Sequence, residues 1–257
     1  MIDYILMKAL NIRTLLAVFL LTIEFIFSSK NVFAQNSNIL SPSEIKDGWI
    51  LLFDGKTSAG WLSSDGSKFP AQGWVISNGE LYTKPAPDLH SSDIITEKEY
   101  SDFEFSTDFK TTVNANSGIK YFFTNYPTGG LLGLEYQILD DLKNDERFGG
   151  KNGNHQCSAL YDMFPASANK KLKPVGEWNT AKIVSKGKHV EHWLNGEKIL
   201  EFDRLSPEYL KVLAESKYKD AVPAFGSVIK GHILLQFHGD EVSFKNIKIK
   251  TFRSTTN

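Results

Sequence analysis

The sequence has 257 residues, of which 41% are hydrophobic and 23% are charged, and its formal net charge is −1. This composition is typical of a globular protein and includes neither the basic excess that would attract nucleic acid nor an acidic tract. Cys157 is the one cysteine in the sequence, so an intrachain disulfide is excluded.

The first 34 residues have the pattern of a secretory signal peptide. Lys8 and Arg13 precede the apolar run LLAVFLLTIEFIF, and Val32 and Ala34 are the small residues expected before a cut after Ala34. The run spans about 13 residues, fewer than the roughly 20 that cross a membrane, and it contains Glu24. We therefore expect a periplasmic or extracellular protein without a membrane span after processing. A retained membrane anchor is the alternative.

A short lead-in, residues 35–47, is followed by one predicted domain over residues 48–252 and a tail over 253–257. Strand-forming runs recur between turn signals, with no linker and no internal repeat. The runs are GWILLFDG, GWVISNGELYT, DFEFSTDFKTT, SGIKYFF, LEYQIL, SALYDM, TAKIVSKG, HVEHWLNGEKIL and the two halves of a final hairpin, GHILLQFHGDEVSFKNIKIK. Asn-Gly pairs in SNGE and LNGE predict two further hairpins. Many short strands with few helices predict an all-β sandwich or barrel.

Alternation along four of these runs predicts which side chains face the core. The expected core residues are Phe103, Phe105, Phe109, Ile119, Tyr121, Phe123, Leu134, Tyr136, Ile138, Ile233, Leu235 and Phe237. If the four strands share one sheet, its other face carries Glu104, Asp108, Lys120, Glu135, Gln137, Gln236 and His238, with Phe122 and Leu234 beside them. This face is richer in amide, imidazole and charged groups than an ordinary wet face, which favours sugar binding or catalysis over simple solvation.

Each of these groups suits a limited chemistry. Glu135 or His238 could move a proton at neutral pH, and Lys120 could stabilise an oxyanion. Gln137 and Gln236 are expected to bind sugar hydroxyls. The further candidates for substrate binding are Asp140, His155, Tyr161, Glu104 and Asp108.

No cofactor is predicted. His238, His155 and Glu135 could together hold a divalent metal, but the sequence contains no compact ligand motif for one. His189 and His192 lack the i, i+2 spacing that would place both on one face of a strand, so we interpret them as structural. Cys157 is interpreted as a buried small apolar residue and not as a nucleophile.

One helix is predicted, over residues 206–219. Ser206 is a good N-cap, Pro207 suits the first helical position and Glu208 complements the helix dipole. Leu210, Leu213 and Ala214 form a weak apolar stripe that should lie against the sandwich. Residues 140–156 form a long polar loop of the kind that shapes the rim of a site or is merely mobile.

From about Trp49 to Ile249 the sequence resembles the 3-keto-disaccharide hydrolase domain family of secreted bacterial proteins. The resemblance rests on an ordered set of segments: LLFDGKTSAGW, GWVISNGELYT, SDIITEKEYSDFEFSTDFK, NSGIKYFF, LEYQILDD, GEWNTAKIVSKGKHVEHWLNGEKI and LLQFHGDEVSFKNIKIK. It implies a concanavalin A-like sandwich of two antiparallel sheets, of jelly-roll type, with one sheet face serving as the sugar site. The chain departs from the family at Phe237, where an Asp often precedes the final His-Gly.

The resemblance also implies a substrate and a mechanism. The substrate is a glycoside or disaccharide whose C3 has been oxidised to a ketone by a partner sugar 3-oxidoreductase. The ketone acidifies the C2 hydrogen, so that deprotonation at C2, loss of the aglycone from C1 and addition of water follow in turn. Glu135 and His238 would divide the acid and base roles, and Lys120 or a metal would stabilise the enolate.

Two alternatives remain open. A conventional glycoside hydrolase would use paired carboxylates. Glu135 and Asp140 match the laminarinase-like motif E-x-D-x-x-E only in part, with Gln in the middle and Asp at the end. Residues five apart face opposite ways on a regular strand, so that pair would require a bulge. The other alternative is a sugar-binding module without catalysis, since a fold does not fix a function.

Overall fold

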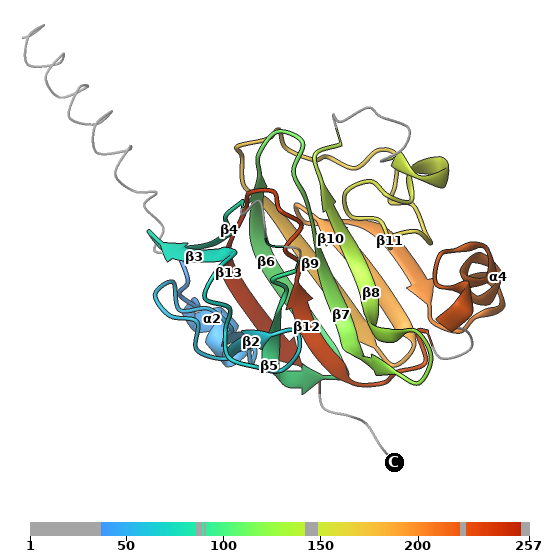
Figure 1. Ribbon diagram of the computed structural model, residues 1–257, viewed down its shortest axis with the longest axis horizontal. Helices are drawn as coiled ribbons and strands as arrows, with labels where there is room; N and C mark the ends of the chain where they lie inside the picture. Colours follow the sequence, from blue (N-terminus) through green and yellow to red (C-terminus); the bar gives the residue numbers. More distant parts are fainter. Residues whose placement is uncertain (1–36, 86–88, 90, 142–148, 222–224, 253–257) are drawn as a thin grey trace, which may run out of the picture. The chain divides into compact units, whose positions relative to one another are not determined.

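The computed structural model consists of two antiparallel sheets (Figure 1). The alternating apolar residues are buried between these sheets. The structure describes residues 37–85, 89, 91–141, 149–221 and 225–252. The predicted signal peptide and the tail therefore lie outside the described residues. The two-sheet, all-β architecture confirms the predicted fold class.

All pairings in both sheets are antiparallel. In the larger sheet the strands follow the order β11 (Glu197–Asp203), β10 (His189–Leu194), β9 (Asn179–Lys186), β6 (Phe103–Thr111), β13 (Val242–Thr251), β4 (Glu80–Thr83) and β3 (Trp74–Ser77), and β1 (Ile50–Leu51) also pairs with β13. In the smaller sheet the order is β2 (Trp61–Ser63), β5 (Ile94–Tyr100), β12 (Gly231–Leu235), β7 (Asn116–Tyr126) and β8 (Gly130–Leu139). Among the described residues the helical segments are α2 (Pro42–Lys46), η1 (Lys151–Gly153), α4 (Pro207–Glu215) and η2 (Lys219–Ala221). No helix in the described part of the chain is long and apolar enough to cross a membrane.

Turn chemistry explains the two short hairpins. Asn78 and Gly79 join β3 to β4, Asn195 and Gly196 join β10 to β11, and all four residues have positive φ angles, as a two-residue type I′ turn requires. The predicted final hairpin is wrong. β12 lies in the five-stranded sheet and β13 in the eight-stranded sheet, so the connection between them crosses from one sheet to the other.

A bulge in β7 corrects one part of the predicted alternation. The register against β8 shifts between Tyr121 and Thr124, and Phe122 has a φ of 53°. Phe122 therefore joins Tyr121 in the main core, and Phe123 turns to the outer face, where it packs with Ile95 and Leu234. The other predicted core residues lie in the core as expected.

The free edge of β8 is covered by the segment 157–164. Gln137 donates its backbone N–H to the carbonyl of Ala159 (3.1 Å), and Tyr161 donates its own to the carbonyl of Glu135 (3.0 Å). The prediction of a strand over SALYDM is wrong, because Ser158 and Asp162 have positive φ angles that interrupt an extended conformation. The segment protects an edge strand from pairing with other chains and brings Tyr161 beside β8.

Helix α4 is shorter than predicted. Ser206 caps it by accepting the N–H of Tyr209 (3.1 Å), as expected, but the helix ends at Glu215, and the following turn leads into η2. Its buried residues are Tyr209 and Leu213, whereas Leu210 is exposed. Tyr209 stacks on Phe202 of β11, with ring centroids 6.1 Å apart, so α4 lies to the side of the sheets (Figure 1).

Candidate active site

Six of the predicted site residues line one small cavity on the outer face of the five-stranded sheet. The cavity has a volume of about 90 Å³ and is lined by Asn116, Lys120, Glu135, Gln137, Tyr161, Lys217, Gln236 and His238. The residues come from β7, β8, the link after β12 and two loops. Alternation along three strands thus places polar groups together on the face opposite the core.

Lys120 and Glu135 are directly opposite each other on β7 and β8, with 3.7 Å between Nζ and Oε2. The side chain of Glu135 also lies over Gly118, which is two residues before Lys120 on the same face of β7. A Cβ at Gly118 would lie 2.7 Å from Oε1 of Glu135, so the carboxylate occupies space that any other residue would fill. Glycine at this position therefore allows the carboxylate to lie flat against the sheet.

Glu135 is only 5% exposed, and burial raises the pKa of its carboxyl group. The positive charges of Lys120, Lys217 and His238 oppose this increase, while the nearby Asp93 carboxylate adds to it. A carboxyl group whose pKa is raised in this way is a stronger base than an ordinary glutamate, which suits it to taking a proton from a substrate.

The link after β12 carries Gln236 and His238. Between them Phe237 is buried in the core and anchors the link, and its N–H donates to Asp93 (2.8 Å). Gln236 donates its N–H to the carbonyl of Gly118 (2.9 Å), so the backbone continues beside β7 beyond the end of β12. His238 is exposed, at the open side of the cavity.

Asp93 lies behind this link. Burial raises the pKa of its carboxyl group, against the lowering effects of the Phe237 N–H and of the charges on Lys120 and His238. Asp93 therefore forms part of the electrostatic environment of the cavity without lining it.

Gln137 has an unused hydrogen-bond acceptor. Its Nε2 donates to Oδ1 of Asn116 (3.0 Å), and its Oε1 is buried without a partner among the described residues. A buried carbonyl oxygen without a donor is costly. A sugar hydroxyl in the cavity could supply that donor.

Tyr161 and Lys217 form the wall of the cavity that does not belong to the sheet. Nζ of Lys217 lies 4.1 Å from the centre of the Tyr161 ring. His155 stacks on the other side of that ring, with centroids 4.4 Å apart, and its Nε2 contacts Asp162 at 2.7 Å. Asp162 also accepts the backbone N–H of Lys217 (2.6 Å) and so joins the two loops.

The structure corrects three predicted site residues. Glu104 and Asp108 lie on β6 in the eight-stranded sheet, so the assumption that all four strands share a sheet is wrong. Glu104 pairs with Lys182 and Lys250, and Asp108 accepts hydrogen bonds from Thr180 and Asn246. His155 stands behind Tyr161 and does not line the cavity.

Asp140 lies at a different place from Glu135. It follows the end of β8, accepts the N–H of Asn114 (2.9 Å) and lines a separate cavity of about 340 Å³ with Asp141 and Lys170. No bulge in β8 brings it to the face of Glu135, because the β7–β8 register is regular from Asn116 to Tyr121. The two carboxyl groups therefore do not face each other across one cavity.

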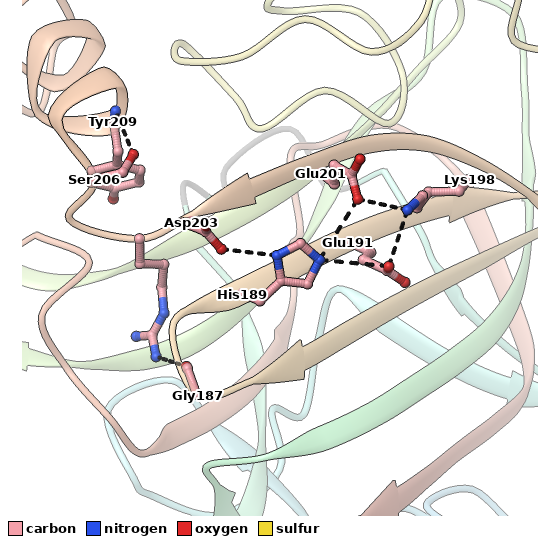
Figure 2. A network of polar contacts seen from close by, with 9 residues as sticks. Gly187, His189, Glu191, Lys198, Glu201, Asp203, Ser206 and Tyr209 are labelled. Carbon is pink, nitrogen blue, oxygen red and sulfur yellow. Dashed lines mark hydrogen bonds and ion pairs between the residues drawn. The ribbon is translucent and has the colours of Figure 1, made fainter.

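The three residues considered above as possible metal ligands, His238, His155 and Glu135, do not gather, because His155 is turned toward Asp162 behind Tyr161. Among the described residues, His189, Glu191 and Glu201 bring potential ligand atoms within 4.8 Å of one another. Figure 2 shows that the ammonium group of Lys198 joins both carboxylates, at 3.3 Å from Glu191 and 2.6 Å from Glu201. This partly exposed cluster on β10 and β11 is thus a network of ion pairs that already contains its own cation.

Two other candidate groups are structural. His192 is fully buried and lies between Tyr121 and the carbonyl of Ser158, and burial lowers its pKa to about 4. Cys157 is also fully buried, and burial raises the pKa of its thiol to about 12. A neutral imidazole and a neutral thiol inside the core agree with the interpretations made from sequence.

Lys217, Asp93 and Asn116 were not predicted from the sequence. No pattern marks Lys217, which follows the helix, or Asp93, which precedes β5. Asn116 occupies the same face of β7 as Lys120, so the alternation applied to that strand would have found it if the run had been extended by one residue.

Comparison with known proteins shows to which family the chain is similar. Residues 48–250 match the family model of the 3-keto-alpha-glucoside-1,2-lyase-like domain. The chain is 33% identical over 247 residues to a 3-keto-disaccharide hydrolase of Bacteroides thetaiotaomicron, covering 86% of this chain and 84% of the relative. A crystal structure of a Parabacteroides distasonis protein described as a glycosyl hydrolase has a TM-score of 0.73 and 31% identity, covering 85% of this chain and all of the other. A second structure from that organism, described in the same way, has a TM-score of 0.60 and 30% identity, covering 79% and 99%.

Proposed function

The chain belongs to the 3-keto-alpha-glucoside-1,2-lyase-like domain family, and on this basis we propose that it cleaves glycosides that carry a ketone at C3. It is a carbohydrate hydrolase or lyase that acts on a glycosidic bond. The observation that carries the finer proposal is the makeup of the cavity: one buried carboxyl group, Glu135, beside the ammonium group of Lys120, with the imidazole of His238 at the open side.

The proposed reaction begins at C2. The carboxylate of Glu135 takes the C2 proton, the C2–H electron pair forms a C2–C3 double bond, and the carbonyl electrons move to the C3 oxygen to give an enolate. Lys120 stabilises the negative charge on this oxygen. A ketone at C3 is required, because without it the C2 carbanion has no oxygen to receive the charge.

The second half of the reaction breaks the glycosidic bond. The enolate returns its electrons to C3, a C1–C2 double bond forms and the aglycone leaves C1 with its oxygen. His238 gives a proton to that oxygen, since an imidazole can donate one near neutral pH. Water then adds to the double bond at C1 with a proton at C2, which yields the free 3-keto sugar.

The two alternatives account for the cavity less well. A conventional hydrolase requires two carboxyl groups about 5 to 9.5 Å apart on either side of the bond. Of the described residues that line the cavity, Glu135 alone is a carboxylate, and Asp140 lines another cavity. A binding module would gain nothing from a buried carboxyl group with a raised pKa beside a lysine, because burying such a group is costly.

Turnover of oxidised and plain glucosides tests the function. We expect aglycone release from 4-nitrophenyl 3-keto-glucosides of either anomer and none from the unoxidised parent compounds. Release from the unoxidised compounds would favour a conventional hydrolase. Sugar binding without turnover of either set would favour a binding module.

Substitution tests the assigned roles. Glu135→Gln and His238→Asn should each lower the rate of ketoglycoside cleavage by roughly 10²–10⁴, the usual contribution of a positioned acid or base. Binding should change much less, because Gln137 and Gln236 remain. Glu104→Gln, on the other sheet, is the matched control and should retain the parent rate. Rates within about threefold of the parent in both site variants would contradict the roles proposed here.

The proposed substrate requires a sugar 3-oxidoreductase as functional partner, and the sequence pattern of residues 1–34 supports export to the periplasm or beyond. Mass spectrometry of the protein from its native host should find a mature N-terminus at or near Gln35. A form that retains Met1 and fractionates with membranes would contradict this expectation.

A further inference from the structure

Lys217 is a second ammonium group in the cavity, and it reaches the cavity from outside the sheets. It follows α4, at the turn between that helix and η2, and its backbone is tied to Asp162. Its side chain lines the same cavity as Glu135 and Lys120. A loop and a strand thus place two positive charges around one carboxyl group.

The surroundings of the Lys217 ammonium group differ from those of Lys120. Lys120 pairs with Glu135 at 3.7 Å, whereas Nζ of Lys217 makes no ion pair with any carboxylate in the described part of the chain. Instead it lies over the faces of Tyr161 and Tyr218, at 4.1 and 5.0 Å from the ring centres. Two aromatic faces hold the cation in position without neutralising it.

The electrostatics of Lys217 agree with this description. Although much of the residue is exposed, burial of its charged end is the main cause that lowers its pKa, and the charge on Lys120 lowers it further. Glu135 and Asp162 act in the opposite direction. A cation that has lost part of its hydration and has no direct counterion gains more than a hydrated one when an anion forms beside it.

We propose that Lys217 is a further catalytic residue, which binds the C3 oxygen of the substrate and stabilises the enolate together with Lys120. This proposal rests on the proposed function, because the enolate exists only on a 3-keto substrate. The ammonium group of Lys120 is already paired with the Glu135 carboxylate, whereas the positive charge of Lys217 can interact directly with the enolate oxygen. When Glu135 takes the C2 proton, the negative charge moves from the carboxylate to the C3 oxygen, and the two lysines then face that oxygen.

The experiment compares the full-length parent with Lys217→Met, Lys217→Arg and a control, Lys219→Met. Methionine keeps the apolar contact with the Tyr161 ring and removes the charge, whereas arginine keeps both the charge and the ring contact. Lys219 is exposed, two residues away, and does not line the cavity. Cleavage of a 4-nitrophenyl 3-keto-glucoside gives kcat and KM. Exchange of the C2 hydrogen of 3-keto-1,5-anhydroglucitol for solvent deuterium, followed by NMR, reports enolate formation without an aglycone.

We expect Lys217→Met to lower kcat by about 10²–10³, the usual loss when one oxyanion-stabilising group is removed, with KM within about threefold of the parent. Deuterium exchange should slow by a similar factor. Lys217→Arg should recover most of both rates, and Lys219→Met should match the parent. Thermal unfolding of each variant identifies any loss of fold, and Lys217→Gln provides a second neutral variant.

Three results would overturn the proposal. If Lys217→Met and Lys217→Gln cleave and exchange within about threefold of an active parent, Lys217 does not stabilise the enolate, and the proposed function stands without it. If arginine fails to restore either rate in a folded protein, charge at this position is not the cause of the loss. If the parent cleaves no 3-keto-glucoside of either anomer, the proposed function fails and the role of Lys217 fails with it.

Discussion

Two features of its surroundings act in opposite directions on the charge of Glu135. Its side chain is buried against the sheet over Gly118, which favours the neutral form, and it faces Lys120, which favours the charged form. Burial is the larger effect, so the pKa lies above the ordinary value of 4.5. The carboxyl group therefore takes up a proton at a higher pH than an ordinary glutamate does.

This shift predicts the shape of the pH–rate profile. As a base, Glu135 is active only when ionised, so kcat/KM should rise with pH through the raised pKa and fall on the acid side of it. The ascending limb should therefore lie above pH 4.5 in the parent. Measurement of kcat/KM on a 3-keto-glucoside from pH 4 to 9 would show this limb. A profile that is flat down to pH 4.5 would mean that Glu135 is not the group that limits the rate.

At the scale of elements, two glycines in the five-stranded sheet leave room for different neighbours, one for a side chain and the other for backbone. At Gly118 a Cβ would meet the end of the Glu135 side chain, which can move. At Gly231, the first residue of β12, a Cβ would lie 2.5 Å from the backbone carbonyl carbon of Phe122, at the bulge in β7. Backbone in the middle of a sheet cannot move away without disturbing the adjacent pairing.

Alanine at these two positions should therefore give opposite results. Gly118→Ala should displace the Glu135 carboxylate and lower kcat by at least tenfold, with little change in the free energy of unfolding. Gly231→Ala should destabilise the protein by about 1–3 kcal/mol, the usual cost of overpacking, while the folded fraction keeps most of its activity. Urea unfolding and ketoglycoside turnover of both variants would check this. Equal effects of both variants on stability would contradict the interpretation.

The elements also show what the sequence could and could not predict. Alternation along β7, β8 and the extended run that contains β12 and Gln236 placed Lys120, Glu135, Gln137 and Gln236 on one face, because side-chain direction in an extended segment depends only on local backbone geometry. The same rule misplaced Glu104 and Asp108, because it fixes a face of a strand and not the sheet to which the strand belongs. Lys217 could not be predicted, since its position depends on how α4 and the segment 157–164 pack together.

At the scale of the whole molecule, the buried His192 makes the free energy of unfolding depend on pH in the acid range. Its Nδ1 donates to the carbonyl of Ser158 (3.0 Å), so its Nε2 accepts from the hydroxyl of Tyr121 (2.9 Å) and the ring is neutral. The tyrosine belongs to the five-stranded sheet and the histidine to the eight-stranded sheet. The contact therefore joins the two layers of the sandwich inside the core.

Because burial lowers the pKa of His192 to about 4, its unfolded form binds a proton at higher pH than its folded form. The contribution to stability is complete above pH 6.5 and is lost as the pH falls toward 4, by roughly 3 kcal/mol in total. His192→Gln should destabilise the protein at pH 7 but flatten this dependence. Urea unfolding of both proteins from pH 7 to pH 4 is the measurement. Parallel curves would mean that other groups govern acid unfolding.

The position of β13 has a consequence for how the protein is made. This strand contains residues 242–251, near the end of the chain, yet it lies inside the eight-stranded sheet between β6 and β4 and also pairs with β1. While the chain is being synthesised, β6 and β4 lack the neighbour that joins them, so the sheet cannot close before almost the whole chain has emerged. Folding is therefore delayed until synthesis is nearly complete. If residues 1–34 direct export, the same delay keeps the nascent chain unfolded for passage across the membrane.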